Sequence, residues 1–183
     1  MRAYTVTGIV LKRTNFGEKD RIITLFTREL GKVNVVAKGV RRITSRRAPH
    51  LELFNLVRVT VHQGKNYDMV TEAKLTADFA QVKNNLYLVG YLFYIAEVVD
   101  KLLPEQEPHE AVWKLIMATV EKMEKSPEIQ DAEAVTKEFV VRLIWELGFL
   151  PKGRYPKIGV TAFVEHLAER NVKSRKFIED VKK

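Results

Sequence analysis

The sequence contains no cysteine, and histidine occurs only four times in its 183 residues. Without cysteine the chain can form no disulfide, thiolate zinc site, iron–sulfur cluster or cysteine nucleophile. The histidines are scattered with no paired spacing that suits a metal, and every glycine stands singly, so no glycine-rich phosphate loop is present. We therefore expect a protein without catalytic activity, metal or cofactor.

Long hydrophobic runs are also absent. Residues 1–6 lack the continuous apolar stretch of a secretory signal. The densest apolar stretch, Leu86–Ala96, is about half as long as a membrane span and is flanked by Lys83 and Glu97. These features predict a soluble, cytoplasmic protein.

Positive charge is concentrated in one part of the chain. The net charge is +8, and residues 1–80 hold 15 Lys and Arg against 7 Asp and Glu. Residues 81–183 hold 16 of each class and are neutral overall. Basic charge confined to one part of a protein usually faces a polyanion. The alternative is that the positive charge serves only solubility. Residues 81–183 argue against it, because they are neutral overall and need no excess charge.

The first 80 residues contain five short runs in which apolar and polar side chains alternate with the period of a β-strand. Turn residues such as Gly17, Gly31 and Gly39 separate these runs. Because closure removes the exposed edges of so short a sheet, we predict a small five-stranded barrel. Its strands are expected at Tyr4–Lys12, Arg21–Thr27, Val33–Lys38, Val57–His62 and Tyr67–Ala73.

After Thr76 the hydrophobic period changes to that of helices. Leu86–Leu103 is apolar on nearly every side and is expected to be a central buried helix. Further helices are expected at Val112–Met123, at Val135–Leu147, at Val160–Arg170 and from Ser174 onward. The sequence therefore predicts an α+β protein of two domains, a barrel over residues 1–80 and an α-helical bundle over residues 81–183.

The densest cluster of positive charge is Lys38–Arg47, which carries five cations, and no acidic residue occurs between Glu29 and Glu52. The segment lies between two predicted strands, so we expect a mobile loop on the barrel rim. Such a loop can contact a phosphate backbone and release its condensed counterions; the alternative is a solvated loop without a ligand. The candidate contacts, including three cations that flank the first turn, are Arg13, Lys19, Arg21, Lys38, Arg41, Arg42, Arg46 and Arg47.

Aromatic side chains could add base stacking, as in other barrels that bind single strands. Phe16 is the strongest candidate, because it lies between Asn15 and Gly17 at a turn tip. Phe54 and Tyr67 are weaker candidates, and for all three the alternative is a residue of the core or of hairpin packing.

Three segments resemble a known family. Residues 4–11 read YTVTGIVL, residues 17–27 read GEKDRIITLFT, and residues 31–42 contain GK and then AKGVRR. Together with the arginine-bearing loop and the helices that follow, they closely resemble the RecO family of bacterial recombination mediators. The resemblance is specific over residues 1–80 and extends more loosely to Leu147–Pro151 (LGFLP).

This resemblance implies an N-terminal oligonucleotide-binding (OB) barrel and an α-helical domain in a non-catalytic, nucleoid-associated protein. It implies binding to single- and double-stranded DNA, annealing of complementary strands, and loading of the RecA recombinase together with RecR. The family's DNA-binding role falls on the barrel cations named above. The acidic C-terminal tail of the single-strand-binding protein would dock on the helical part, where Arg142 is the candidate anchor.

Many members of the family carry a four-cysteine zinc module after the segment that here reads Leu147–Pro151. This chain has Lys152–Lys157 (KGRYPK) in that place, so no zinc is expected there. Two other functions stay open: an adaptor that binds partner proteins through its helices, and an RNA-binding barrel. The second stays open because contacts to the backbone alone do not distinguish the sugar.

Overall fold

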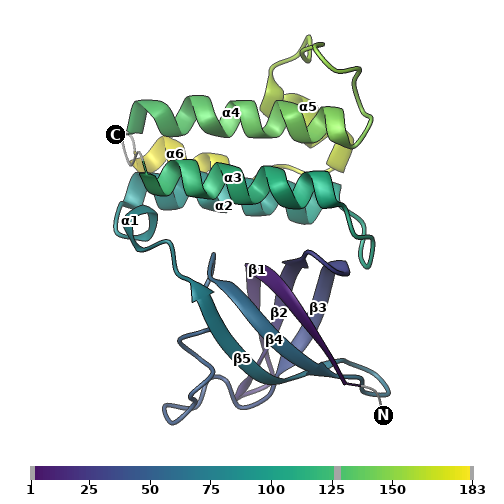
Figure 1. Ribbon diagram of the computed structural model, residues 1–183. Coiled ribbons are helices and arrows are strands. Elements are labelled where there is room, and N and C mark those ends of the chain that lie inside the picture. The colour runs from purple at the N-terminus through teal and green to yellow at the C-terminus, as the bar shows by residue number, and fades with distance from the viewer. Residues whose placement is uncertain (1–2, 126–128, 182–183) are drawn as a thin grey trace. The chain divides into compact units, whose positions relative to one another are not determined.

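The first part of the chain forms a five-stranded β-barrel (Figure 1). The computed structural model describes residues 3–125 and 129–181. The prediction of a five-stranded N-terminal sheet followed by helices is confirmed. The strands are β1 (Ala3–Phe16), β2 (Asp20–Thr27), β3 (Gly31–Ala37), β4 (Leu56–His62) and β5 (Met69–Ala77).

The strands are arranged in the order β1-β2-β3-β5-β4, and β4 pairs back onto β1. Strand β1 is long enough to serve two neighbours, because residues 3–9 pair with β4 and residues 8–16 pair with β2. A register shift between Val10 and Lys12 introduces a bulge, which increases the bend of the strand. A parallel bridge between Val36 of β3 and Met69 of β5 completes the ring. A five-stranded barrel of this connectivity is an OB-fold.

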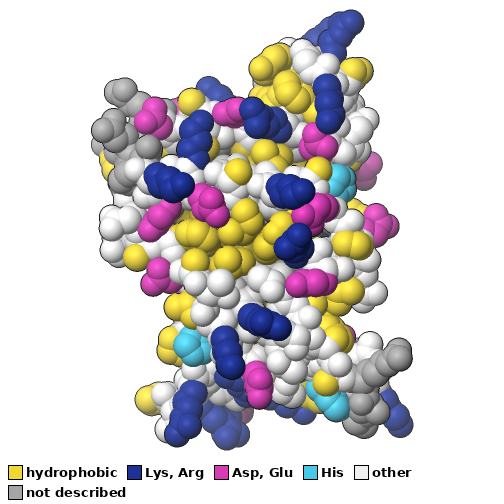
Figure 2. Space-filling model, viewed as in Figure 1, with side chains coloured by type: hydrophobic (Ala, Val, Ile, Leu, Met, Phe, Trp, Pro, Cys, Tyr) yellow, Lys and Arg dark blue, Asp and Glu magenta, His cyan; other side chains and the backbone are white. Residues whose placement is uncertain are grey.

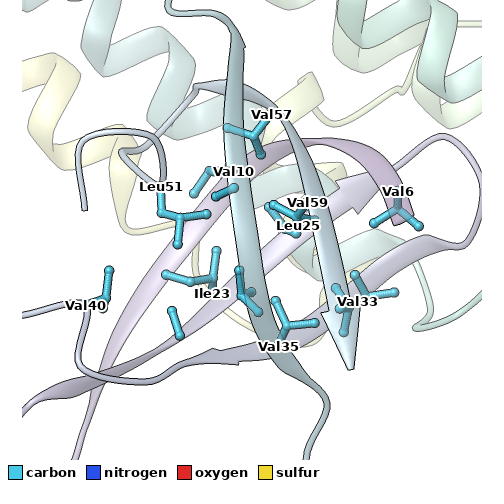
Figure 3. Packing of buried hydrophobic residues seen from close by; sticks show 14 residues of the cluster. Val6, Val10, Ile23, Leu25, Val33, Val35, Val40, Leu51, Val57 and Val59 are labelled. Carbon is cyan, nitrogen blue, oxygen red and sulfur yellow. The ribbon is translucent and has the colours of Figure 1, made fainter. Parts of the chain in front are cut away.

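Branched aliphatic side chains fill the barrel. Val57 and Val59 of β4 are completely buried while Arg58 between them is exposed, which is the alternation that predicts a half-buried strand. Figure 3 shows that Val40 and Leu51, which come from the long connection after β3, join the side chains of the strands in this core. The barrel core therefore includes part of a loop.

A short segment between two helices, Pro104–His109, belongs to the same compact unit as the residues up to Asp78. Glu105 forms a parallel bridge with Lys32 of β3. The backbone N–H of Gln106 donates to the carbonyl oxygen of Lys32 at 2.8 Å. The first unit is therefore built from two separate stretches of the chain.

The beginning of β3 is shaped to receive this segment. The Asn34 side-chain amide donates to the Glu105 carboxylate at 2.6 Å. At Gly31, whose φ is +68°, an added Cβ would lie 2.0 Å from the carbonyl oxygen of Glu107. Both the backbone conformation and the close approach therefore require glycine at this position.

The remaining described elements are helices. The one-turn helix α1 was not predicted from the sequence. Helix α4 begins at Ile129 instead of Val135, because residues 129–134 hold three polar residues and two alanines and so carry little of the apolar periodicity that marks a helix. The helices are α1 (Ala80–Lys83), α2 (Leu86–Leu102), α3 (Glu110–Lys125), α4 (Ile129–Glu146), α5 (Val160–Ala168) and α6 (Ser174–Val181).

Helix α6 docks on the central helix α2. An added Cβ at Gly90 of α2 would lie 3.2 Å from side-chain carbons of Phe177 and Ile178, so the small residue lets α6 approach closely. The Glu97 carboxylate of α2 accepts hydrogen bonds from the backbone N–H and the hydroxyl of Ser174, at 2.8 and 2.6 Å. A carboxylate at a helix N-terminus satisfies free backbone N–H groups and complements the helix dipole.

Candidate nucleic-acid interface

Three connections between strands meet at one end of the barrel, termed here the loop end. The Arg41 Nη1 donates to the carbonyl oxygen of Gly17 at 3.3 Å, which joins the second connection to the first. The Phe16 ring lies edge-to-face against Tyr67 with the ring centroids 5.6 Å apart, which joins the first connection to the third. The connections are residues 17–19 between β1 and β2, residues 38–55 between β3 and β4, and residues 63–68 between β4 and β5.

The long connection, residues 38–55, is anchored in the barrel, whereas the sequence analysis predicts a mobile loop. Val40 and Leu51 are only 2% and 1% exposed within the core (Figure 3). Near the far end, the backbone N–H of Phe54 donates to the carbonyl oxygen of Val10 at 2.8 Å. The residues between these anchors form consecutive turns. An anchored loop has less conformational entropy to lose when it binds a ligand.

Two of the candidate cations brace the loop end. Arg47 donates to the carbonyl oxygens of Lys38, at 2.7 Å, and of Val70, so it ties the long connection to the beginning of β5. Arg13 forms an ion pair with Glu52, and its side chain is only 19% exposed. Contacts of these two side chains with a phosphate would have to compete with the contacts they already make.

Two more candidates are partly engaged. The Nε of half-buried Arg21 donates to the Asn15 side chain at 3.4 Å. Arg41 is exposed and uses one donor on Gly17. A guanidinium has five N–H donors, so both arginines retain donors for a further acceptor.

The other four candidates are open to solvent. Their side chains are exposed and make no hydrogen bond or ion pair within the part of the chain that the structure describes. In Figure 2, Lys and Arg side chains gather around the end of the barrel where the long connection lies in Figure 1. These four cations are Lys19, Lys38, Arg42 and Arg46.

The aromatic candidates separate into an exposed pair and a core residue. Phe16 and Tyr67 are 38% and 56% exposed and contact each other at the loop end. Phe54 is only 4% exposed, so of the two possibilities stated for it the structure supports a core residue and not a stacking residue. The contact between Phe16 and Tyr67 was not predicted from the sequence, although both residues lie next to turns that the OB connectivity can bring together.

The third connection is held by Asp68. Its carboxylate accepts a hydrogen bond from the Tyr4 hydroxyl at 2.7 Å, and its carbonyl oxygen accepts one from the Val36 N–H at 2.8 Å. Burial, together with the hydrogen bond to the charged carboxylate, raises the pKa of Tyr4. The hydroxyl therefore stays protonated near neutral pH and continues to donate, which keeps the connection beside the exposed aromatic pair.

In the helical unit, Arg142 lies on the exposed side of α4, where it forms an ion pair with Glu138 at 2.6 Å. It does not line the cavity of about 230 Å³ that lies among α2, α4, α5 and α6. The structure therefore does not bring the candidate anchor to this cavity. The lining includes Tyr94, Thr136, Lys137, Val140, Thr161 and Ile178.

Within residues 3–125 and 129–181, no three His, Asp or Glu side chains lie close enough together to hold a metal ion. Over the same ranges, no helix has the length and apolar character needed to cross a bilayer.

The barrel connectivity and the helices that follow define the class, which is an OB-fold domain joined to an α-helical domain. Residues 1–79 match the family model for the N-terminal part of recombination protein O, and residues 84–155 match the model for its C-terminal part. The chain belongs to the RecO family of DNA repair proteins, which confirms the resemblance seen in the sequence.

Curated relatives agree with this assignment. The DNA repair protein RecO of Symbiobacterium thermophilum is 36% identical over 151 residues, which cover 82% of this chain and 59% of the relative. RecO of Dehalococcoides mccartyi is 32% identical over 82% of this chain and 58% of its own length. RecO of Pelotomaculum thermopropionicum is 31% identical over 82% of this chain and 57% of its own length. The chain thus spans just under three fifths of these relatives.

Proposed function

We propose that this chain is a non-catalytic DNA-binding mediator of recombinational repair, and that it captures DNA through the loop end of its barrel. The observation that carries the proposal is the set of exposed side chains of Lys19, Lys38, Arg42 and Arg46, which have no partner within the described residues. Three of them lie on the long connection, which is anchored in the barrel, and Lys19 lies on the first connection, next to the exposed aromatic pair. Membership of the RecO family supports DNA as the polyanion.

Electrostatic capture needs no reaction chemistry. Each cation that contacts a phosphate releases condensed counterions, which favours binding to single and double strands alike. Exposed rings such as Phe16 and Tyr67 offer stacking surfaces to unpaired bases. Cations on separate connections could neutralise two strands at once, which lowers the repulsion between them and allows complementary bases to pair. The proposed activity is therefore strand annealing.

The proposed partners follow from the family. RecR would act with this chain in loading RecA, and the acidic tail of the single-strand-binding protein would dock on the helical unit. For the tail, the cavity among α2, α4, α5 and α6 is a better candidate than the surface around Arg142. Both cations are already paired, Lys137 of the cavity lining with Glu133 and Arg142 with Glu138, so the advantage of the cavity is its apolar lining.

The test is the salt dependence of binding to a labelled single strand, a duplex and an RNA of the same sequence. The double variant Arg42→Ala/Arg46→Ala should reduce the slope of log affinity against log salt by about 0.7 per lost contact on the single strand. A matched control removes two exposed lysines of the helical unit, Lys114→Ala/Lys122→Ala, and should leave the slope unchanged.

The outcomes distinguish the three functions. Loss of slope in the first variant alone supports the proposal. Affinity and slope that survive that variant contradict it. Tighter binding to RNA than to DNA favours an RNA-binding barrel, and no binding to any nucleic acid favours an adaptor that acts through its helices.

A further inference from the structure

An isoleucine lies among the exposed residues 41–44 of the long connection. Ile43 is the most exposed of the large hydrophobic side chains in the described part of the chain, with a relative exposure of 106%. The unpartnered cations Arg42 and Arg46 lie on either side of it in the sequence. An apolar side chain held in water between cations is unfavourable in the free protein, and the contact that would bury it is not made within the described residues.

The exposure of Ile43 is imposed by the structure around it. The backbone N–H of Arg42 donates to the carbonyl oxygen of Gly39 at 3.1 Å, and that of Ser45 donates to the carbonyl oxygen of Arg42 at 2.9 Å. Buried Val40 fixes the first of these turns, and the two backbone contacts of Arg47 fix the chain after the second. Ile43 is therefore presented by two consecutive turns that are held in place by Val40 and Arg47.

We infer that Ile43 packs against the face of an unpaired base while Arg42 and Arg46 contact the phosphates beside it, so that this loop prefers single strands to duplex. The inference rests on the proposed function. DNA-binding proteins do place apolar side chains, isoleucine among them, against base steps. In a duplex the faces of the bases are stacked, and the cost of unstacking a step offsets what the burial of one isoleucine returns. In a single strand the faces are already accessible.

The inference predicts a contribution to affinity that does not depend on salt, because burying an aliphatic side chain releases no counterion. Replacing Ile43 by serine should weaken binding to an oligothymidine of about 20 nucleotides by roughly five- to tenfold. The slope of log affinity against log salt should stay the same, and affinity for duplex should change by less than about twofold. Ile43→Leu should bind as the parent chain does. Melting temperature should not change, because Ile43 buries nothing in the free protein.

A matched control and a second ligand complete the experiment. Leu30→Ser alters another exposed aliphatic side chain, in the turn at the other end of β2, and should have no effect on binding. On an abasic strand of the same length, the parent chain and Ile43→Ser should bind equally, because the base that Ile43 contacts is missing.

Each outcome decides between the two proposals. If the parent chain binds no DNA, both the proposed function and the inference are wrong. If the parent binds and Ile43→Ser binds equally well, the inference is wrong while the proposed function survives. A reduced salt slope, or an equal loss on duplex and abasic strands, would mean that Ile43 only shapes the loop, and it would overturn the inference as well.

Discussion

The adjacent arginines Arg46 and Arg47 have different structural roles at the loop end. Arg46 is exposed and has no partner within the described residues, whereas Arg47 uses its guanidinium on two backbone carbonyl groups. Both belong to one run of cations in the sequence, and nothing in that run distinguishes them. What distinguishes Arg47 is its contact with the carbonyl group of Val70 in β5, a strand that follows much later in the chain.

The first prediction separates these two arginines. Arg47→Ala should destabilise the chain by about 1–3 kcal/mol, because it removes two hydrogen bonds and leaves carbonyl groups of Lys38 and Val70 without a donor. Arg46→Ala should change the free energy of unfolding by less than about 0.5 kcal/mol. Urea denaturation of the two variants measures the difference. Equal stabilities would contradict the bracing role of Arg47.

The second prediction uses two glycines with similar backbone conformations. Gly31 and Gly17 have φ of +68° and +61°, but only at Gly31 would an added Cβ meet backbone atoms. Gly17→Ala should cost about 1–2 kcal/mol, the usual strain of a left-handed residue. Gly31→Ala should cost clearly more, because the Glu107 carbonyl group must move away. Thermal denaturation of the pair provides the comparison, and similar melting temperatures would show that Pro104–His109 is not held against β3.

At the level of elements, the strands were predictable because alternation and turn residues act locally. Val57–His62 is predicted and β4 covers Leu56–His62, since its valines alternate cleanly with polar residues. The anchoring of the long connection could not be predicted in the same way. Val40 and Leu51 look like ordinary loop residues until the closed barrel provides a core to bury them.

The candidate site was predictable in its residue types and only partly in its geometry. Charge density selected the cations of the long connection, three of which are open to solvent, as is Lys19 in the first turn. The internal contacts of Arg13 and the burial of Phe54 depend on which segments meet in three dimensions. A single sequence carries no direct signal for such contacts between distant segments.

The third prediction concerns the attachment of α6, which depends on one carboxylate. Burial by itself raises the pKa of Glu97, but hydrogen bonds from Ser174 and Lys173 and the nearby Lys101 ammonium outweigh burial, so the pKa lies below its ordinary value of 4.5. A lowered pKa in the folded state stabilises the fold at pH values above the ordinary value. This stabilisation disappears as the pH falls through the folded-state pKa.

Glu97→Gln should therefore destabilise the chain by about 1–2 kcal/mol near neutral pH, and the difference from the parent should shrink toward pH 3. Thermal unfolding between pH 3 and 8 measures this, and hydrogen exchange of the α6 amides locates it. Glu121→Gln, on the exposed face of α3, is the control and should have little effect at any pH. A difference between Glu97→Gln and the parent that stays constant with pH would mean that the charge of Glu97 is not what holds α6.

For the whole molecule, the residues that carry the excess positive charge are not the same set as the residues that pack into the barrel unit. All the excess positive charge lies in residues 1–80, yet the barrel unit also includes Pro104–His109 from between two helices. That segment contacts Gly31, Lys32 and Asn34 at the beginning of β3. The long connection leaves from the other end of the same strand. Stability and DNA binding should therefore be separable in this unit.

The last prediction tests that separation with two shortened chains. Residues 1–80 alone should melt at a lower temperature than the same residues joined through a flexible linker to residues 103–110. The linked segment restores the bridge to Lys32 and the hydrogen bond between Asn34 and Glu105. At a temperature where both are folded, they should bind a labelled single strand with the same affinity and salt slope, and close to those of the full chain, because the four open cations are present in both. Calorimetry and salt titrations of the two proteins supply the comparison.

If the linked segment raises affinity without raising the melting temperature, Pro104–His109 contributes to binding and the two properties are not separate. If residues 81–183 bind the strand more tightly than either shortened chain, the barrel is not the main DNA-binding surface.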